Sequence, residues 1–321
     1  MKKKVLLSTA LLGALAASVA VPTLTLAAPT VLDGHGYIQY AEDNDPGTPE
    51  DPEDPEVPID PPGTGPTGGA LAIDSITNLN FNVIKNEAGQ YVYANAGNAD
   101  EKKQASTANK GTYYADKVVS PVIAKDENGN PHKDGSGAYY YVKAGNTNPI
   151  ALADLATKAT LAKADAEKVT GPNFVEVTDK RITDGKNGWI LSAELTKQFT
   201  ADATHSLVGA SITYNNLLLN SSADTSLWPT LDGIGNSGYK LDLNTEKVFA
   251  KAGSATDTTK GFGTYTLAFG NTANYTAPAG QTSTGAIDST NSSVVLDVPA
   301  GQTLTDKEYT ADITWTLTSA F

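Results

Sequence analysis

Strict alternation between apolar and polar residues near the C-terminus is the feature that most constrains the fold of this chain. Between residues 311 and 318 the apolar members are Ala311, Ile313, Trp315 and Leu317, and the polar members are Asp312, Thr314, Thr316 and Thr318. A period of two places the two sets on opposite faces of an extended strand. Trp189, Leu191, Ala193 and Leu195 repeat the pattern. Both stretches are therefore predicted to be strands with one buried face.

The chain after residue 69 shows the same texture throughout. Short runs rich in β-branched and aromatic residues are separated by Gly, Asn and Asp, which is typical of antiparallel sheets. The predicted strands are 71–76, 79–84, 90–94, 118–124, 138–143, 173–178, 188–195, 207–214, 238–243, 247–251, 263–269, 292–298 and 308–318. The sequence therefore predicts an all-β fold, an antiparallel β-sandwich that is Ig-like or related.

One segment departs from this texture. Asn148 and Pro149 precede an alanine-rich stretch that extends to Val169. Asn is a favoured N-cap, and proline is favoured at the first helical position. A short α-helical, Ala-rich insertion is therefore predicted at about 147–169.

Composition limits the chemistry that the chain can perform. The sequence contains no cysteine, and Lys+Arg 23 against Asp+Glu 36 give a formal net charge of −13. Disulfides and thiolate ligands or nucleophiles are therefore absent, and an acidic chain lacks the lysines and arginines that would bind nucleic acid or an anionic membrane surface. His35, His132 and His205 lie far apart without a zinc-protease or hydrolase motif. We expect no metal, no cofactor and no catalytic residue, and hence a protein that is not an enzyme.

The N-terminus predicts export. Lys2, Lys3 and Lys4 precede an apolar run from Val5 to Val21, and residues 25–27 read Thr-Leu-Ala, a cleavage pattern of small residues. Residues 1–27 are therefore predicted to be a signal peptide, and its removal would change the net charge from −13 to −16. No membrane association is expected after cleavage. The short segment 28–40 follows and is a candidate strand of the main domain.

Residues 41–69 form an acidic, proline-rich segment. Its prolines recur at every third position from Pro46 to Pro61, which is the period of the polyproline II helix, and it contains no Lys or Arg. Such a segment lacks the apolar residues needed for a core of its own. It is predicted to be a stiff polyproline II spacer, or alternatively a loop within the fold. The β domain is accordingly predicted to span 70–321.

Two Trp-x-Leu motifs carry a resemblance to a known family. Gly188-Trp189-Ile190-Leu191 and the terminal stretch 309–318 (YTADITWTLT) are similar to the paired motifs of WxL-domain cell-surface proteins of Gram-positive bacteria. The stretches GALAIDSITNLNFN (69–82), FVEVTDKR (174–181) and VVLDVPAG (294–301) resemble the flanks of those motifs. The resemblance covers most of residues 70–321.

The resemblance implies a non-catalytic surface protein that is secreted and attached noncovalently to the peptidoglycan of the cell wall. It also implies partner surface proteins encoded nearby, and in some members adhesion to host matrix proteins. The alternative function is therefore an adhesin or interaction subunit that a partner holds at the surface. The sequence ends at Thr318-Ser319-Ala320-Phe321 without a sorting signal, which supports this alternative, because something else must then hold the protein at the surface.

The role of the motif residues stays open at this point. Trp189, Leu191, Trp315 and Leu317 are either structural core or a wall-binding surface, because an alternating strand of a sandwich buries the same residue types. Trp228 lies in a Ser-, Asp- and Thr-rich context and is the candidate for an exposed stacking surface.

Overall fold

The computed structural model describes residues 38–87, 90–93, 111–182, 188–232, 238–254, 257 and 259–320. The predicted signal peptide, residues 1–27, lies outside the described residues, as do residues 28–37 of the segment that follows it. Residues 38–40 belong to no strand, and Ile38 and Tyr40 are exposed. Residues from Ala41 onward form a compact unit of their own.

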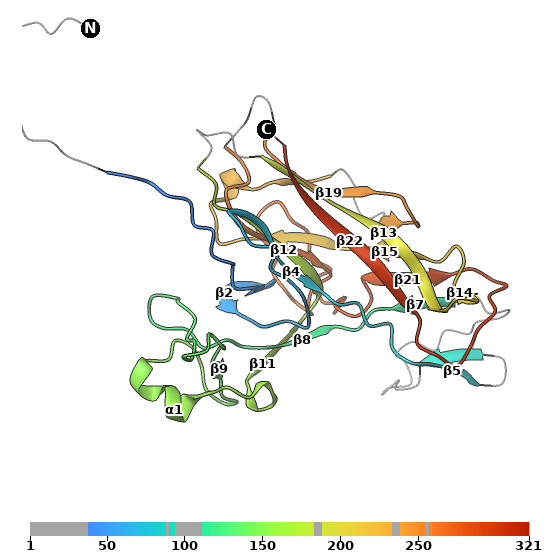
Figure 1. The fold of residues 1–321 in the computed structure, drawn as a ribbon, viewed down its shortest axis with the longest axis horizontal. Helices are drawn as coiled ribbons and strands as arrows, with labels where there is room; N and C mark the ends of the chain where they lie inside the picture. Colours follow the sequence, from blue (N-terminus) through green and yellow to red (C-terminus); the bar gives the residue numbers. More distant parts are fainter. Residues whose placement is uncertain are drawn as a thin grey trace, which may run out of the picture. The chain divides into compact units, whose positions relative to one another are not determined.

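Among the described residues, three antiparallel sheets of four or five strands make up most of this unit (Figure 1). The first has the order β16 (Leu217–Asn220), β20 (Gly263–Phe269), β12 (Asn173–Asp179), β4 (Leu71–Thr77) and β3 (Gly63–Thr64). The second has the order β14 (His205–Ser206), β13 (Trp189–Asp202), β19 (Lys247–Ala252) and β17 (Thr230–Leu231), and β22 (Thr310–Ser319) also pairs with β13. The third has the order β18 (Tyr239–Leu241), β15 (Ser211–Tyr214), β21 (Val294–Val298) and β7 (Gly111–Tyr114).

Shorter elements complete the described fold. Four two-stranded pairs are β1 (Glu50–Asp51) with β2 (Asp54–Pro58), β5 (Ile84–Glu87) with β6 (Gln90–Tyr93), β8 (Val118–Pro121) with β11 (Lys168–Gly171), and β9 (Tyr141–Val142) with β10 (Ala159–Thr160). The described α-helix is α1 (Leu155–Lys158), and the 3-10 turns are Leu152–Asp154, Lys163–Asp165 and Thr225–Leu227. The prediction of a mainly β, antiparallel fold with a short helical insertion is therefore confirmed.

One large hydrophobic core joins the three sheets. It contains Val175 and Leu267 from the first sheet, Leu191 from the second and Ile212 and Leu296 from the third. Because apolar side chains from the facing sheets meet in one cluster, the arrangement is sandwich-like, and burial of this cluster is the main stabilising contribution.

The sheet that contains β12 is covered on both faces. All seven residues of β12 are buried. Val175 and Val177 contact the main core, whereas Phe174 belongs to a second cluster with Ile59 on the opposite face. In contrast, the buried and exposed residues of β22 alternate as its sequence predicts, because this strand presents one face to solvent.

The proline-rich segment supplies the cover of that second face. Its residues form β1, β2 and β3, and Pro58 and Ile59 are buried. The amide of Asp60 donates to the carbonyl of Pro121 (3.0 Å), and Ile59 forms a bridge to Val122. These contacts favour the alternative of a segment within the fold over that of a polyproline II spacer. The periodicity of its prolines is local, whereas its few apolar residues find partners on a sheet far away in sequence.

The Ala-rich insertion contains much less helix than predicted. The helix α1 has four residues and begins at Leu155, and β10 follows it immediately. Asn148 does not cap a helix: its Nδ2 donates to the carbonyl of Ile123 (2.8 Å), and its Oδ1 accepts from the amide of Lys125 (3.0 Å). Ile150 and Ala159 instead pack in a small core of this region. Non-local burial thus prevails over the local helical preference of alanine, because a short helix is only marginally stable without tertiary packing.

Most predicted strands lie close to observed ones, and the differences have local causes. Residues 79–83 form no strand, and the strand predicted at 118–124 ends at Pro121, which has no amide to donate to a ladder. β7, β11 and β16 have four residues each and were not predicted. A run of four residues shows too few alternations to reveal its period.

Candidate functional site

The two Trp-x-Leu motifs lie on neighbouring strands. β13 and β22 pair antiparallel and run side by side (Figure 1), with Leu191 opposite Leu317 and Ala193 opposite Trp315. The motifs are more than a hundred residues apart in the sequence, and this register brings them together in one sheet. Their apolar stripes therefore share one face, the face that packs on the main core.

Trp189 lies inside this core at the start of β13. Its side chain is 1% exposed, and its Nε1–H donates to the carbonyl of Gly261 (2.9 Å). The Tyr265 ring lies 6.0 Å away, centroid to centroid. Gly261 has a φ of +92°, and a Cβ there would lie 2.7 Å from the Trp189 Nε1. Only glycine fits this conformation and this contact, so Gly261 leaves the space that the Trp189 indole occupies.

Trp315 is the centre of an aromatic cluster that joins the sheets. It is 9% exposed, and its ring centroid lies 4.7 Å from Phe249, 5.9 Å from Tyr214 and 6.1 Å from Phe269. These three rings come from β19, β15 and β20, which belong to three different sheets. Aromatic pairs at such distances stabilise a core beyond the area that they bury. The side chain of Trp315 therefore connects the three sheets.

The two leucines of the motifs differ in burial. Leu191 is 1% exposed, whereas Leu317 is half-buried and packs against the same core. The indole rings and the Leu191 side chain are thus directed inward. Residues on the solvent face of β22, Thr314, Thr316 and Thr318, are exposed instead.

A comparison with protein families matches residues 27–129 and 143–320 to the WxL domain, described as a surface cell wall-binding domain. The chain belongs to the WxL family. Neither the curated proteins nor the solved structures contain a match to it. This WxL protein is therefore a cell-surface protein with a cell wall-binding domain, and among its described residues no helix is long and apolar enough to cross a membrane.

An arginine fixes the end of the WxL strand pair where β13 begins. The Arg181 guanidinium donates two hydrogen bonds to Asp179, from Nε to Oδ1 (2.8 Å) and from Nη2 to Oδ2 (2.7 Å). Its Nη2 also donates to the carbonyl of Gly188 (3.0 Å), and its Nη1 donates to the Ser319 hydroxyl (2.6 Å). The Asp179 side chain is fully buried. Charge-assisted, two-point contacts of this kind hold both strand ends in register.

Sequence reasoning did not single out Asp179 or Arg181 as functional. They lie in the stretch FVEVTDKR that resembles the family. The pattern that could have indicated their ion pair is an aspartate and an arginine two residues apart at the end of an apolar strand. The hydrogen bond with Asp179 raises the pKa of Arg181 further above its usual value, so the arginine is positively charged at every physiological pH.

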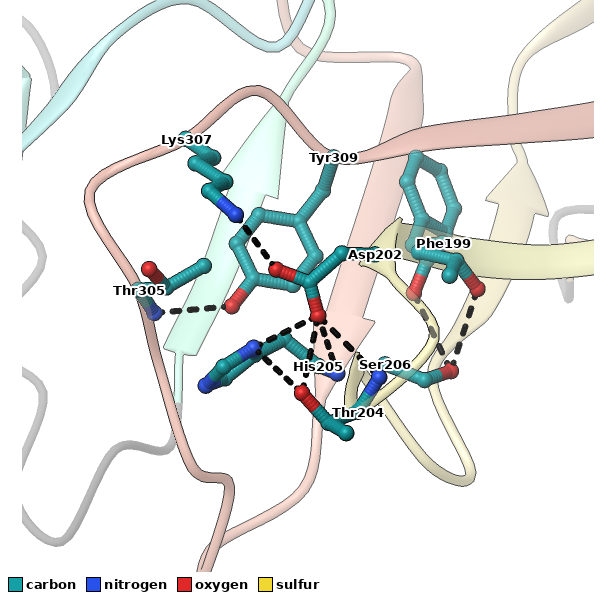
Figure 2. Close-up of polar contacts among 9 residues, drawn as sticks. Phe199, Asp202, Thr204, His205, Ser206, Thr305, Lys307 and Tyr309 are labelled. Atoms are coloured by element: carbon teal, nitrogen blue, oxygen red, sulfur yellow. Dashed lines mark hydrogen bonds and ion pairs between the residues drawn. The ribbon is translucent and has the colours of Figure 1, made fainter.

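The opposite end of the strand pair is held by Asp202 (Figure 2). Its Oδ1 accepts from the His205 amide (3.1 Å) and lies 2.7 Å from the His205 Nδ1, and its Oδ2 accepts from Lys307 Nζ (2.6 Å). These donors hold the pKa of Asp202 far below its usual value. Ser206 donates to the Phe199 carbonyl (3.3 Å) rather than to the histidine. Asp202, His205 and Ser206 therefore stabilise a turn. They lack the arrangement of a serine nucleophile with its base.

Trp228 is not an exposed stacking residue. Its side chain is 8% exposed, and its Nε1–H donates to the Ala223 carbonyl (2.9 Å). The prediction of an exposed surface at Trp228 is therefore wrong. Its polar neighbours in the sequence lie in the 3-10 turn Thr225–Leu227, while the indole packs into the main core.

A buried carboxyl group lies beneath the proline-rich segment. Glu176 is fully buried, its Oε2 accepts from the Glu50 amide (3.0 Å) and the Thr266 hydroxyl (3.0 Å), and its Oε1 has no hydrogen-bond partner. Burial raises the pKa of Glu176, and it raises the pKa of Glu50 to about 7. Asp74 nearby accepts from the Gly47 amide (3.2 Å). No group of three or more His, Asp or Glu among the described residues is placed to hold a metal.

Proposed function

We propose that this WxL protein is exported by its N-terminal signal peptide and attaches noncovalently to the peptidoglycan of a Gram-positive cell wall, without catalysing a reaction. The observation that carries the proposal is the pair of WxL motifs on adjacent strands of a domain that belongs to a wall-binding family. In this proposal the motif residues have a structural role. They hold the sheets together, and other surfaces of the same domain bind the wall.

The charge of the chain constrains the mode of attachment. A protein of net charge −13 is repelled by anionic polymers, so attraction to wall phosphates does not hold it. Hydrogen bonds and ring stacking with glycan or peptide support attachment without a net positive charge. Such contacts are short-ranged, so retention is expected to change little when salt is raised from low to physiological concentration.

A sedimentation assay tests the proposal. The chain without residues 1–27 is mixed with purified peptidoglycan from which other wall polymers have been removed, at physiological salt. Retention in the pellet is expected, with bovine albumin as the acidic non-binding control. Absence of retention would refute direct attachment. Retention that requires an added neighbouring surface protein would support the alternative of an adhesin or interaction subunit.

A further inference from the structure

A polar cleft lies where the proline-rich segment meets β4 and the segment 130–142. It has a volume of about 520 Å³, which is within the usual range for ligand sites. One wall carries the exposed rings of Pro46 and Pro66, and the opposite wall carries Lys133 and Tyr139. Asp74 and Ser75 of β4 also line it. The cleft is separate from the WxL motif pair, whose residues do not line it.

Lys133 and Tyr139 lie in a segment outside the residues that match the family model. The family match covers residues 27–129 and 143–320, so residues 130–142 are outside it. This segment forms a hairpin in which Lys133 and Tyr139 face each other as bridge partners. The Asp134 carboxylate closes its turn by accepting from the amides of Ser136 (2.8 Å) and Ala138 (2.9 Å). The hairpin is thus an ordered segment, outside the matched residues, that contributes Lys133 and Tyr139 to the lining of the cleft.

The opposite wall is held in place by close backbone contacts. A Cβ on Gly47 would lie 2.6 Å from the Asp74 carboxyl carbon, and a Cβ on Gly63 would collide with the carbonyl of Ile76. The absence of side chains therefore allows the proline-rich segment to lie directly against β4. The Tyr139 hydroxyl also lies 3.5 Å from the Thr48 hydroxyl, a contact that joins the hairpin to the proline-rich segment. Both walls are therefore positioned before a ligand binds, which lowers the entropic cost of binding.

The lining chemistry selects among wall components. Proline and tyrosine rings offer flat apolar faces, and carboxylates, a serine hydroxyl and a lysine offer hydrogen bonds. Asp60 is ion-paired with Lys163, and the other acidic groups of the lining, Asp45 and Asp74, outnumber its one lysine, Lys133. This excess of negative charge disfavours phosphodiester polymers. A neutral sugar presents apolar C–H faces to the rings and hydroxyl and amide N–H donors to the carboxylates.

We infer that this cleft is a binding site for an uncharged, N-acetylated oligosaccharide of the cell-wall glycan, and that the hairpin 130–142 gives this chain its glycan specificity within the WxL family. The inference rests on the proposed function and names a substrate class and a site for it. Tyr139 stacks on a sugar face. Lys133, whose Nζ lies over one face of the Tyr139 ring at 4.9 Å from its centre, donates to an oxygen of the stacked sugar.

Calorimetric titration with a tetramer of N-acetylglucosamine tests the site. The chain without residues 1–27 is titrated at physiological salt, and binding is expected. Tyr139→Ala is expected to lower the affinity at least about tenfold, whereas Tyr139→Phe keeps the stacking ring and stays within about threefold. Lys133→Ala is expected to lower it about threefold to tenfold. Lys143→Ala, an exposed lysine of the same region that does not line the cleft, is the matched control and leaves the affinity unchanged.

The outcomes separate this inference from the proposed function. Tyr139 also packs on a small apolar cluster, so its replacement by alanine can destabilise the fold. Tyr139→Ala is therefore interpreted only if its melting temperature stays within a few degrees of the wild type. Otherwise the affinities of Lys133→Ala and Lys133→Glu test the site. Peptidoglycan retention by the wild type, without binding of the tetramer or with full binding by these variants, would overturn the inference and leave the proposed function standing. Competition by stem peptide instead of glycan would also overturn it. Failure of the wild type to bind peptidoglycan would refute the proposed function itself.

Discussion

Replacement of Trp315 by alanine tests whether the WxL motif is a structural element. The indole is 9% exposed and contacts the rings of Phe249, Tyr214 and Phe269 at 4.7, 5.9 and 6.1 Å between centroids. Truncation of a buried aromatic side chain costs about 3–5 kcal/mol, the sum of lost burial and of the cavity left behind. Three aromatic partners from three sheets place Trp315→Ala near the upper end of that range.

The expected effect is large relative to the stability of a domain. The free energy of unfolding of folded domains is about 5–15 kcal/mol. The variant therefore stays folded only if the free energy of unfolding of the wild type exceeds the loss. For a domain of this size the loss corresponds to a decrease in melting temperature of roughly 6–20 °C. Urea denaturation followed by tryptophan fluorescence and circular dichroism measures the loss directly, as a lower midpoint at unchanged slope.

A neighbouring position on the same strand provides the control. Thr316 follows Trp315 on β22 but is exposed on the opposite face. Thr316→Ala is expected to change the free energy of unfolding by less than about 1 kcal/mol. The structural interpretation of the motif fails if Trp315→Ala melts within two or three degrees of the wild type and loses peptidoglycan binding, because the ring would then be a ligand surface.

Three further predictions concern buried groups. Burial raises the pKa of Glu176, so the folded state keeps a proton that the unfolded chain releases above about pH 4. The free energy of unfolding is therefore highest below that pH and decreases as the pH rises. Glu176→Gln is expected to stabilise the protein at pH 8 but hardly at pH 5, as measured by urea titration. Arg181→Ala is expected to cost about 3–5 kcal/mol, because it leaves the fully buried Asp179 carboxylate without its cation. Trp228→Ala is expected to lower stability by about 3–5 kcal/mol in the same assay and to leave the peptidoglycan affinity of the folded fraction unchanged.

Each of these predictions has a variant that sharpens it. Glu50→Gln is likewise expected to stabilise the protein more at high than at low pH, since burial raises the pKa of Glu50 to about 7. An effect of either glutamine variant that does not change with pH would contradict the raised pKa. Asp179→Asn combined with Arg181→Ala is expected to regain part of the loss, because no uncompensated charge remains buried. Equal losses in the single and double variants would show that desolvation of Asp179 is not the cause. A Trp228→Ala variant of normal stability that loses binding would restore the exposed-surface hypothesis.

The sequence by itself determined the features that depend on near neighbours. Alternation along 189–195 and 311–318 predicted β13 and β22, because the period of two is a property of the extended backbone and needs no knowledge of the partner strand. The two Trp-x-Leu motifs likewise identified the family that the comparison shows. The absence of cysteine and the acidic charge limited the chemistry before any fold was known.

Only the tertiary structure decided which faces are covered. Glu176 alternates with apolar neighbours and would be solvent-exposed on an open sheet face, yet it is fully buried because the proline-rich segment lies over that face. Ile59 is buried for the same reason, through contact with Phe174 at a distance of more than a hundred residues in the sequence. Trp228 packs inward although its neighbours are polar. Burial at these positions depends on contacts between distant segments, which local patterns do not encode.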